Sequence, residues 1–138
     1  MQTEDTEAAL DRVTAADPRY QREAYDFLRE ALDYTQKAIG KANQGKLRHI
    51  TGQELLAGIR SYALAQYGPM ALTLFHEWGV RSCADFGELV FNLIEQNVLS
   101  KTETDTRADF QDGYDFEETF TKPFQPRWRP STKASQRS

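Results

Sequence analysis

The fold is decided by residues 51–96, TGQELLAGIRSYALAQYGPMALTLFHEWGVRSCADFGELVFNLIEQ. Thr51 and Glu54 have the spacing at which a helix N-cap and the third helical residue satisfy each other's backbone donors. Gly68-Pro69 can end one helix and begin the next, and residues 82–85 (SCAD) form a further cap signature. Apolar residues follow each signal at spacings of three and four, so the sequence predicts three consecutive helices between residues 52 and 96.

One or two helices are expected before this three-helix core. The first is predicted at about residues 4–16. The second is predicted to begin at Pro18, with Asp17 as its cap, and to stop at Gly40. Leu and Ala together number 27 whereas Val and Ile number 8, a composition that favours helices over strands.

After residue 96 the periodicity changes. Residues 98–102 and 114–116 are predicted to pair as a hairpin, and Leu47–Ile50 is a candidate for a small first strand. The predicted fold is therefore mainly α with a small β-ribbon (α+β), with a winged-helix-like three-helix core and a C-terminal hairpin over residues 1–120. A plain helical bundle with a β-ribbon is the alternative. Residues 121–138 are predicted to be a disordered basic tail.

The size and composition indicate one small domain. The chain of 138 residues is too short for two ordinary domains. It contains no apolar segment of the roughly 20 residues that a membrane span needs. Its acidic N-terminus is unlike a signal peptide, and its single cysteine, Cys83, cannot form an internal disulfide. We expect a soluble, cytoplasmic protein that does not bind a membrane.

The motifs that suggest catalysis are incomplete. Residues 40–46 match the phosphate-loop pattern G-x-x-x-x-G-K, but Leu47 supplies no hydroxyl for magnesium and a helix is predicted where a strand should precede the loop. His76-Glu77 begins a zinc motif that Val80 fails to complete. We therefore predict no enzyme, no cofactor and no metal site. The only residues that an enzyme could use are Glu54, His76, Glu77, Cys83 and Asp85.

The charge is strongly divided along the chain. Residues 82–118 contain ten acidic residues against Lys101 and Arg107, whereas residues 34–50 and 121–138 contain basic residues and no acid. An acidic third helix and ribbon would repel DNA, so we predict a non-enzymatic interaction module that engages an unknown protein partner through its acidic face and its basic tail. The candidate partner-binding residues are Phe91, Glu88, Glu95, Asp105 and Asp109.

The alternative is a regulatory factor associated with nucleic acid or the ribosome. It would bind RNA or DNA through the basic segments 37–48 and 121–138, and in the second segment arginines alternate with aromatic residues that could stack on bases. The candidate nucleic-acid-binding residues are Lys37, Lys41, Lys46, Arg48, Lys122, Arg127, Trp128 and Arg129.

Several strings of the sequence point to one group of proteins. They are DPRY at residues 17–20, GQELLAGIR at 52–60, GPMA at 68–71, DFGELVFNL at 85–93 and YDF at 114–116. In this order they resemble an uncharacterised family of small proteins from Planctomycetes and Verrucomicrobia, over about residues 8–120. The resemblance implies a bacterial cytoplasmic protein and transfers no catalytic residues.

Overall fold

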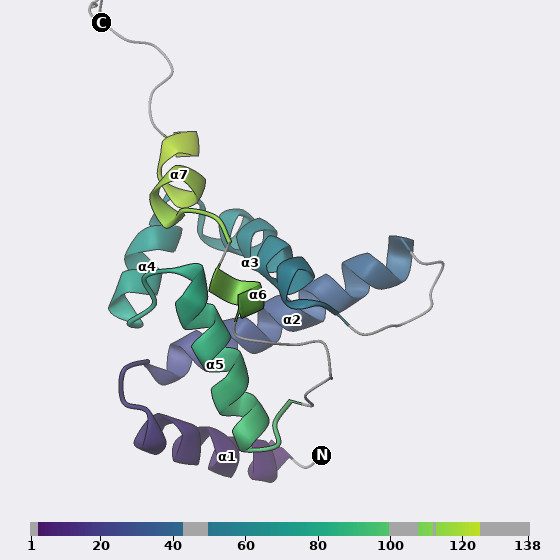
Figure 1. Cartoon of the computed structure of the whole chain (residues 1–138), viewed down its shortest axis with the longest axis vertical. Coiled ribbons are helices and arrows are strands. Elements are labelled where there is room, and N and C mark those ends of the chain that lie inside the picture. The colour runs from purple at the N-terminus through teal and green to yellow at the C-terminus, as the bar shows by residue number, and fades with distance from the viewer. Residues whose placement is uncertain (1–2, 43–49, 100–107, 112, 125–138) are drawn as a thin grey trace, which may run out of the picture.

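A computed structural model describes residues 3–42, 50–99, 108–111 and 113–124, and these residues form helices and no strand (Figure 1). The α-helices are α1 (Thr3–Ala16), α2 (Arg22–Ala42), α3 (Gly52–Tyr67), α4 (Ala71–Glu77), α5 (Cys83–Glu95), α6 (Ala108–Gln111) and α7 (Phe116–Phe120). Two 3-10 helices, η1 (Gly68–Met70) and η2 (Lys122–Phe124), complete the order.

The long helix α2 packs most extensively against α3, while α5 contacts α1, α2, α3 and α6 (Figure 1). Where α2 meets α3, Gly58 is buried against Thr35. A Cβ at Gly58 would stand 1.7 Å from Thr35 Oγ1, whose hydroxyl donates to Ala31 O at 2.7 Å. The absence of a side chain at residue 58 therefore sets how closely the two helices approach.

The core is built around the ring of Phe75, which is fully buried. Its centroid lies 5.3 Å from those of Phe27 in α2 and Phe86 in α5, and 5.2 Å from that of Phe120 in α7. Most of these contacts are edge-to-face, an arrangement that stabilises aromatic pairs beyond their buried area. The short helix α4, which carries Phe75, thus joins α2, α5 and α7 in one apolar cluster.

The capping signals of the three-helix core were largely right. Thr51 and Glu54 form the predicted capping box, and α3 begins at Gly52. Ser82 is the N-cap of α5, but its side chain makes no capping bond; instead the carboxylate of Asp85 accepts from the backbone N–H of Arg81 at 2.8 Å. The prediction for α2 was less accurate, because the helix begins at Arg22 instead of Pro18 and continues through Gly40.

The prediction of a β-ribbon, and with it the winged-helix-like fold, is wrong for the residues that the structure describes. At the expected first strand, Val98 N–H donates to Leu93 O and Asn97 N–H to Ile94 O, with Asn97 at φ 63°. These are the bonds of a Schellman motif that ends α5. At the expected second strand, Asp115 caps α7 by accepting from the N–H of Glu118 at 2.9 Å.

Two other predictions fall partly or wholly outside the described residues. The candidate strand Leu47–Ile50 is described only at Ile50, which is buried. Of the predicted tail, residues 121–124 continue from α7 into η2, whereas residues 125–138 are outside. Among the described helices, none is both long and apolar enough to cross a membrane.

The Gly58–Thr35 contact generates the first prediction. Replacing glycine by alanine inside a helix normally raises stability by about 0.5–1 kcal/mol. Gly58→Ala should instead lower the free energy of unfolding by about 2 kcal/mol, because the new methyl group overlaps Thr35. Urea denaturation followed by circular dichroism measures this, with Ser61→Ala on the exposed side of α3 as the control. A Gly58→Ala variant as stable as the wild type would contradict the packing.

Candidate functional site

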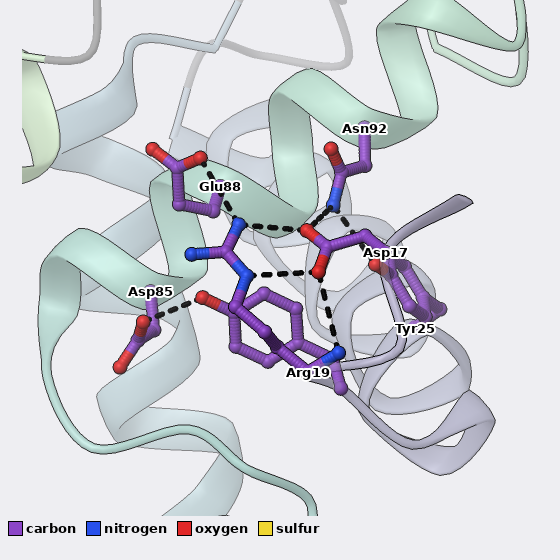
Figure 2. Close-up of polar contacts among 7 residues, drawn as sticks. Asp17, Arg19, Tyr25, Asp85, Glu88 and Asn92 are labelled. Atoms are coloured by element: carbon purple, nitrogen blue, oxygen red, sulfur yellow. Dashed lines mark hydrogen bonds and ion pairs between the residues drawn. The ribbon is translucent and has the colours of Figure 1, made fainter. Parts of the chain in front are cut away.

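The most connected polar cluster lies between the α1–α2 turn and α5 (Figure 2). The Asp17 carboxylate accepts two bonds from the Arg19 guanidinium, Nε to Oδ1 at 2.8 Å and Nη2 to Oδ2 at 2.7 Å. Asn92 Nδ2 donates to the same Oδ2 at 2.9 Å and to the hydroxyl of the buried Tyr25 at 3.0 Å. Glu88 extends the cluster, with Oε1 3.5 Å from Arg19 Nη2.

These bonds hold Asp17 in its charged form. The Arg19 guanidinium, helped by Asn92, lowers the pKa of Asp17 to about 2, against an opposing effect of desolvation. The Asp17 side chain is only 14% exposed, whereas that of Arg19 is 59% exposed. Asp17 is therefore an internal anchor for the turn, and only the outer side of Arg19 faces solvent.

A second contact fixes the same turn to the start of α5. The buried Tyr20 donates its hydroxyl proton to Asp85 Oδ1 at 2.5 Å, while Asp85 Oδ2 accepts from the Arg81 backbone. Burial, and then the bond to Asp85, raise the pKa of Tyr20 above its ordinary value. Both oxygens of Asp85 thus bind protein donors, as do both oxygens of Asp17. These bonds hold the α1–α2 turn against α5, and they occupy both oxygens of each carboxylate.

The five residues available to an enzyme lie in separate surroundings. Glu54 belongs to the capping box of α3 and Asp85 binds Tyr20. Cys83 is buried, donates to Tyr114 O at 3.4 Å, and has its pKa raised by desolvation, so its thiol stays protonated at neutral pH. His76 and Glu77 are exposed at the end of α4. No three His, Cys, Asp or Glu residues of the described part are placed to hold a metal ion.

Two hollows mark the described surface. One, of about 340 Å³, is lined by residues of α4 and the turn that follows it and by residues of the α7 region, among them His76, Arg81, Asp115 and Glu117. The other, of about 590 Å³, runs along α2 between Asp26 and Lys37 and is completed by Tyr62 of α3.

The predicted partner-binding residues are only partly brought together. Glu88 and Glu95 both lie on α5, Glu88 half-buried beside Arg19 and Glu95 exposed. Phe91 is half-buried, with its ring 6.4 Å from that of Phe110 in an edge-to-face contact, so part of this side chain packs within the fold. Asp105 and the side chain of Asp109 lie outside the described residues.

Of the predicted nucleic-acid-binding residues, some lie in the described part of the chain and some lie outside it. Lys37 and Lys41 are exposed on α2, and Lys122 is exposed in η2. In Figure 1 the C-terminal end of α2 and the end of α7 lie on opposite sides of the molecule, so these lysines do not form one patch. Residues Lys46, Arg48, Arg127, Trp128 and Arg129 are outside the described part.

Sequence reasoning missed the residues that are most exposed among the large apolar ones. These are Met70 at 54%, Phe124 at 43% and Tyr34 at 38%. Met70 is the first of the apolar residues that follow Gly68-Pro69 in the sequence, but it belongs to the 3-10 turn η1 that precedes α4. Pro69 in the first helical turn was the available signal, since it places Met70 at the helix entrance, away from the buried stripe.

Comparison of the chain with protein-family models, with curated proteins and with solved structures finds no match. The resemblance to the planctomycete and verrucomicrobial family therefore stays a prediction.

Acid sensitivity tests the role of Asp17. A pKa lowered from 3.8 to about 2 contributes stability above pH 4, and this contribution is lost as the pH falls from 4 to 2. Because Arg19 is partly solvated, we expect Asp17→Asn to lower the free energy of unfolding by about 1 kcal/mol at pH 7 and by much less at pH 2.

Urea denaturation across pH 2 to 7 measures this difference, with Glu77→Gln as a control at an exposed carboxylate. A difference between wild type and Asp17→Asn that stays constant with pH would show that the Asp17–Arg19–Asn92 contacts do not stabilise the charged form.

Proposed function

We propose that the chain is a non-enzymatic protein-interaction module, which binds its partner through the end of the fold formed by η1 and η2. The observation that carries this proposal is the exposure of Met70 and Phe124 at that end. The Phe124 ring lies against η1, since a Cβ at Gly68 would stand 4.0 Å from its Cε1. Exposed apolar side chains with a polar rim are typical of protein-binding surfaces.

Charged residues precede Phe124 in the chain. Asp115, the N-cap of α7, and Glu117 and Glu118 within α7 are exposed, and Lys122 Nζ lies 3.4 Å from Glu118 Oε1. The basic segment 125–138 follows Phe124 in the sequence, with Arg127, Trp128 and Arg129 near its start. A partner that meets both elements would present an apolar site bordered by carboxylates, which pair with these arginines.

Four basic side chains of the described residues pair with carboxylates of the same chain, and this favours a protein partner over nucleic acid. Arg19 pairs with Asp17, Arg22 with Glu7 and Asp11, Lys37 with Asp33, and Lys122 with Glu118. Binding to phosphates requires basic groups that gather on one surface and release counterions. Each of these cations already lies beside a carboxylate, which reduces the positive potential available to a phosphate.

Three further predictions belong to this proposal. Absence of catalysis is supported by the separate surroundings of Glu54, His76, Cys83 and Asp85. A cytoplasmic location is consistent with the unpaired Cys83, which is buried as a free thiol. The nucleic-acid alternative depends largely on Lys46, Arg48 and the segment 125–138, and the experiment below includes it as an outcome.

Charged substitutions at the apolar end test the proposal. We expect Met70→Glu combined with Phe124→Glu to reduce capture of the cellular partner by at least about tenfold, because both side chains would lie at the centre of the interface. Affinity capture with quantitative mass spectrometry, with and without nuclease, measures this. Thr73→Glu, exposed on the neighbouring α4, is the matched control and should capture as the wild type does.

Two results would overturn the proposal. Capture that is unaffected by the double substitution would show that the partner binds elsewhere. Capture that disappears with nuclease would favour the nucleic-acid alternative.

A further inference from the structure

One exposed face of α2 has its charges divided along its length. Among its exposed charged residues, Asp26, Glu30 and Asp33 occupy the N-terminal part, where the half-buried Arg29 also lies, and Lys37 and Lys41 occupy the C-terminal part. At 3.6 residues per turn, the five exposed side chains fall on one narrow stripe. Tyr34, also exposed, lies at the edge of this stripe near its midpoint.

The groove of about 590 Å³ follows this stripe. Tyr62 of α3 borders the groove and donates its hydroxyl to Glu30 Oε1 at 3.0 Å. The rings of Tyr34 and Tyr62 lie 5.3 Å apart, so an aromatic surface stands beside the charged stripe. In Figure 1 the C-terminal end of α2 extends beyond α3.

We propose that a second copy of this chain docks on this face, with the two α2 helices antiparallel around a two-fold axis. In the register centred between residues 33 and 34, Asp26 faces the partner's Lys41. Glu30 faces the partner's Lys37, whose ammonium group is shared with Asp33 of its own chain, since Lys37 Nζ lies 2.9 Å from Asp33 Oδ2. The two-fold axis repeats both pairs, which gives four ion pairs between the chains. The rings of Tyr34 and the partner's Tyr34 meet beside the axis.

The division of charge along α2 favours a second copy of the chain as the partner that docks on this face. An antiparallel copy sets Asp26 and Glu30 against the partner's Lys41 and Lys37, with Asp33 beside the axis, whereas a parallel copy would set like charges against each other. The surroundings of Asp26 fit the same arrangement. Desolvation raises its pKa above the ordinary value despite Arg22 and Arg29, so this carboxylate gains more from an added cation than a fully hydrated one would.

The length of the stripe sets the strength of the dimer. Residues 26–41 span about 24 Å of helix, and one helix pair of this length buries less area than the interfaces of stable dimers. We therefore expect a weak dimer whose dissociation constant rises at least about fivefold when salt screens the four ion pairs.

A charge-swap experiment tests the register directly. One variant, Asp26→Lys/Glu30→Lys, makes the stripe entirely basic apart from Asp33. The other, Lys37→Glu/Lys41→Glu, makes it entirely acidic. Neither can pair with itself in the proposed register, but in a mixture each basic position of one meets an acidic position of the other. The control Glu77→Lys/Glu95→Lys makes the same charge change as the first variant, at exposed positions of α4 and α5.

Sedimentation equilibrium at low salt measures the outcome. The wild type and the control should rise from 15.8 kDa toward twice that mass with increasing concentration. Each swap variant alone should stay at 15.8 kDa, and their equimolar mixture should again approach the dimer mass. Circular dichroism checks that all variants fold. Met70→Glu/Phe124→Glu should dimerise normally, so this result is independent of the partner-binding proposal.

Three outcomes overturn the inference. A wild type that stays monomeric up to about 1 mM shows that no such dimer forms. Swap variants that dimerise alone, or a mixture that does not, show that the register is different. A monomeric wild type whose capture of a foreign protein is lost in the swap variants shows that this face binds another partner.

Discussion

The fold depends on the burial of the Phe75 ring. Phe75 lies on α4, a helix of seven residues that could not persist alone, because isolated helices of this length are unstable in water. Its ring contacts Phe27 of α2, Phe86 of α5, and Phe116 and Phe120 of α7. These contacts stabilise α4 and give the still shorter α7, a helix of five residues, its buried face. Removal of this one ring would leave four helices without a common contact.

The second constraint is the close approach of the turn before α2 to the turn after α4. Gly79 has φ 93°, and a Cβ there would stand 2.2 Å from Arg19 O. Gln21 N–H donates to Trp78 O at 3.0 Å across the same contact. This approach brings Tyr20 to Asp85 and Asp17 to Asn92, so the polar cluster follows from the position of one glycine. The hydrogen bonds of the cluster then hold α1 and α2 against α5. This structural role agrees with the protein donors that occupy its carboxylates.

The sequence was most informative where a signal is local. The capping box at Thr51 and Glu54 and the apolar spacing that follows it depend only on neighbouring residues, and α3 begins where they predict. Asp17 shows the limit, because the same residue type that caps helices binds Arg19 and Asn92 here, and Asn92 is 75 residues away. The predicted strands failed for a related reason. Val98 and Tyr114–Phe116 have strand-like composition, but the Schellman motif at Asn97 and the cap at Asp115 satisfy their backbones locally.

The candidate surfaces could not be derived from the sequence, because exposure is a property of packing. Tyr34 belongs to the same helix as the buried Phe27, and only the rotation of α2 on α3 places it outside. Its stripe belongs to α2, whereas Met70 and Phe124 belong to η1 and η2. A dimer formed through α2 would therefore leave both apolar ends free. A dimer that carries two such apolar ends would bind a repeated or dimeric partner more tightly than a single chain does. Once the first end has bound, the second binds within the same complex, at a high effective concentration. Weak pairing of α2 would thus strengthen binding at η1 and η2 without any added contact there.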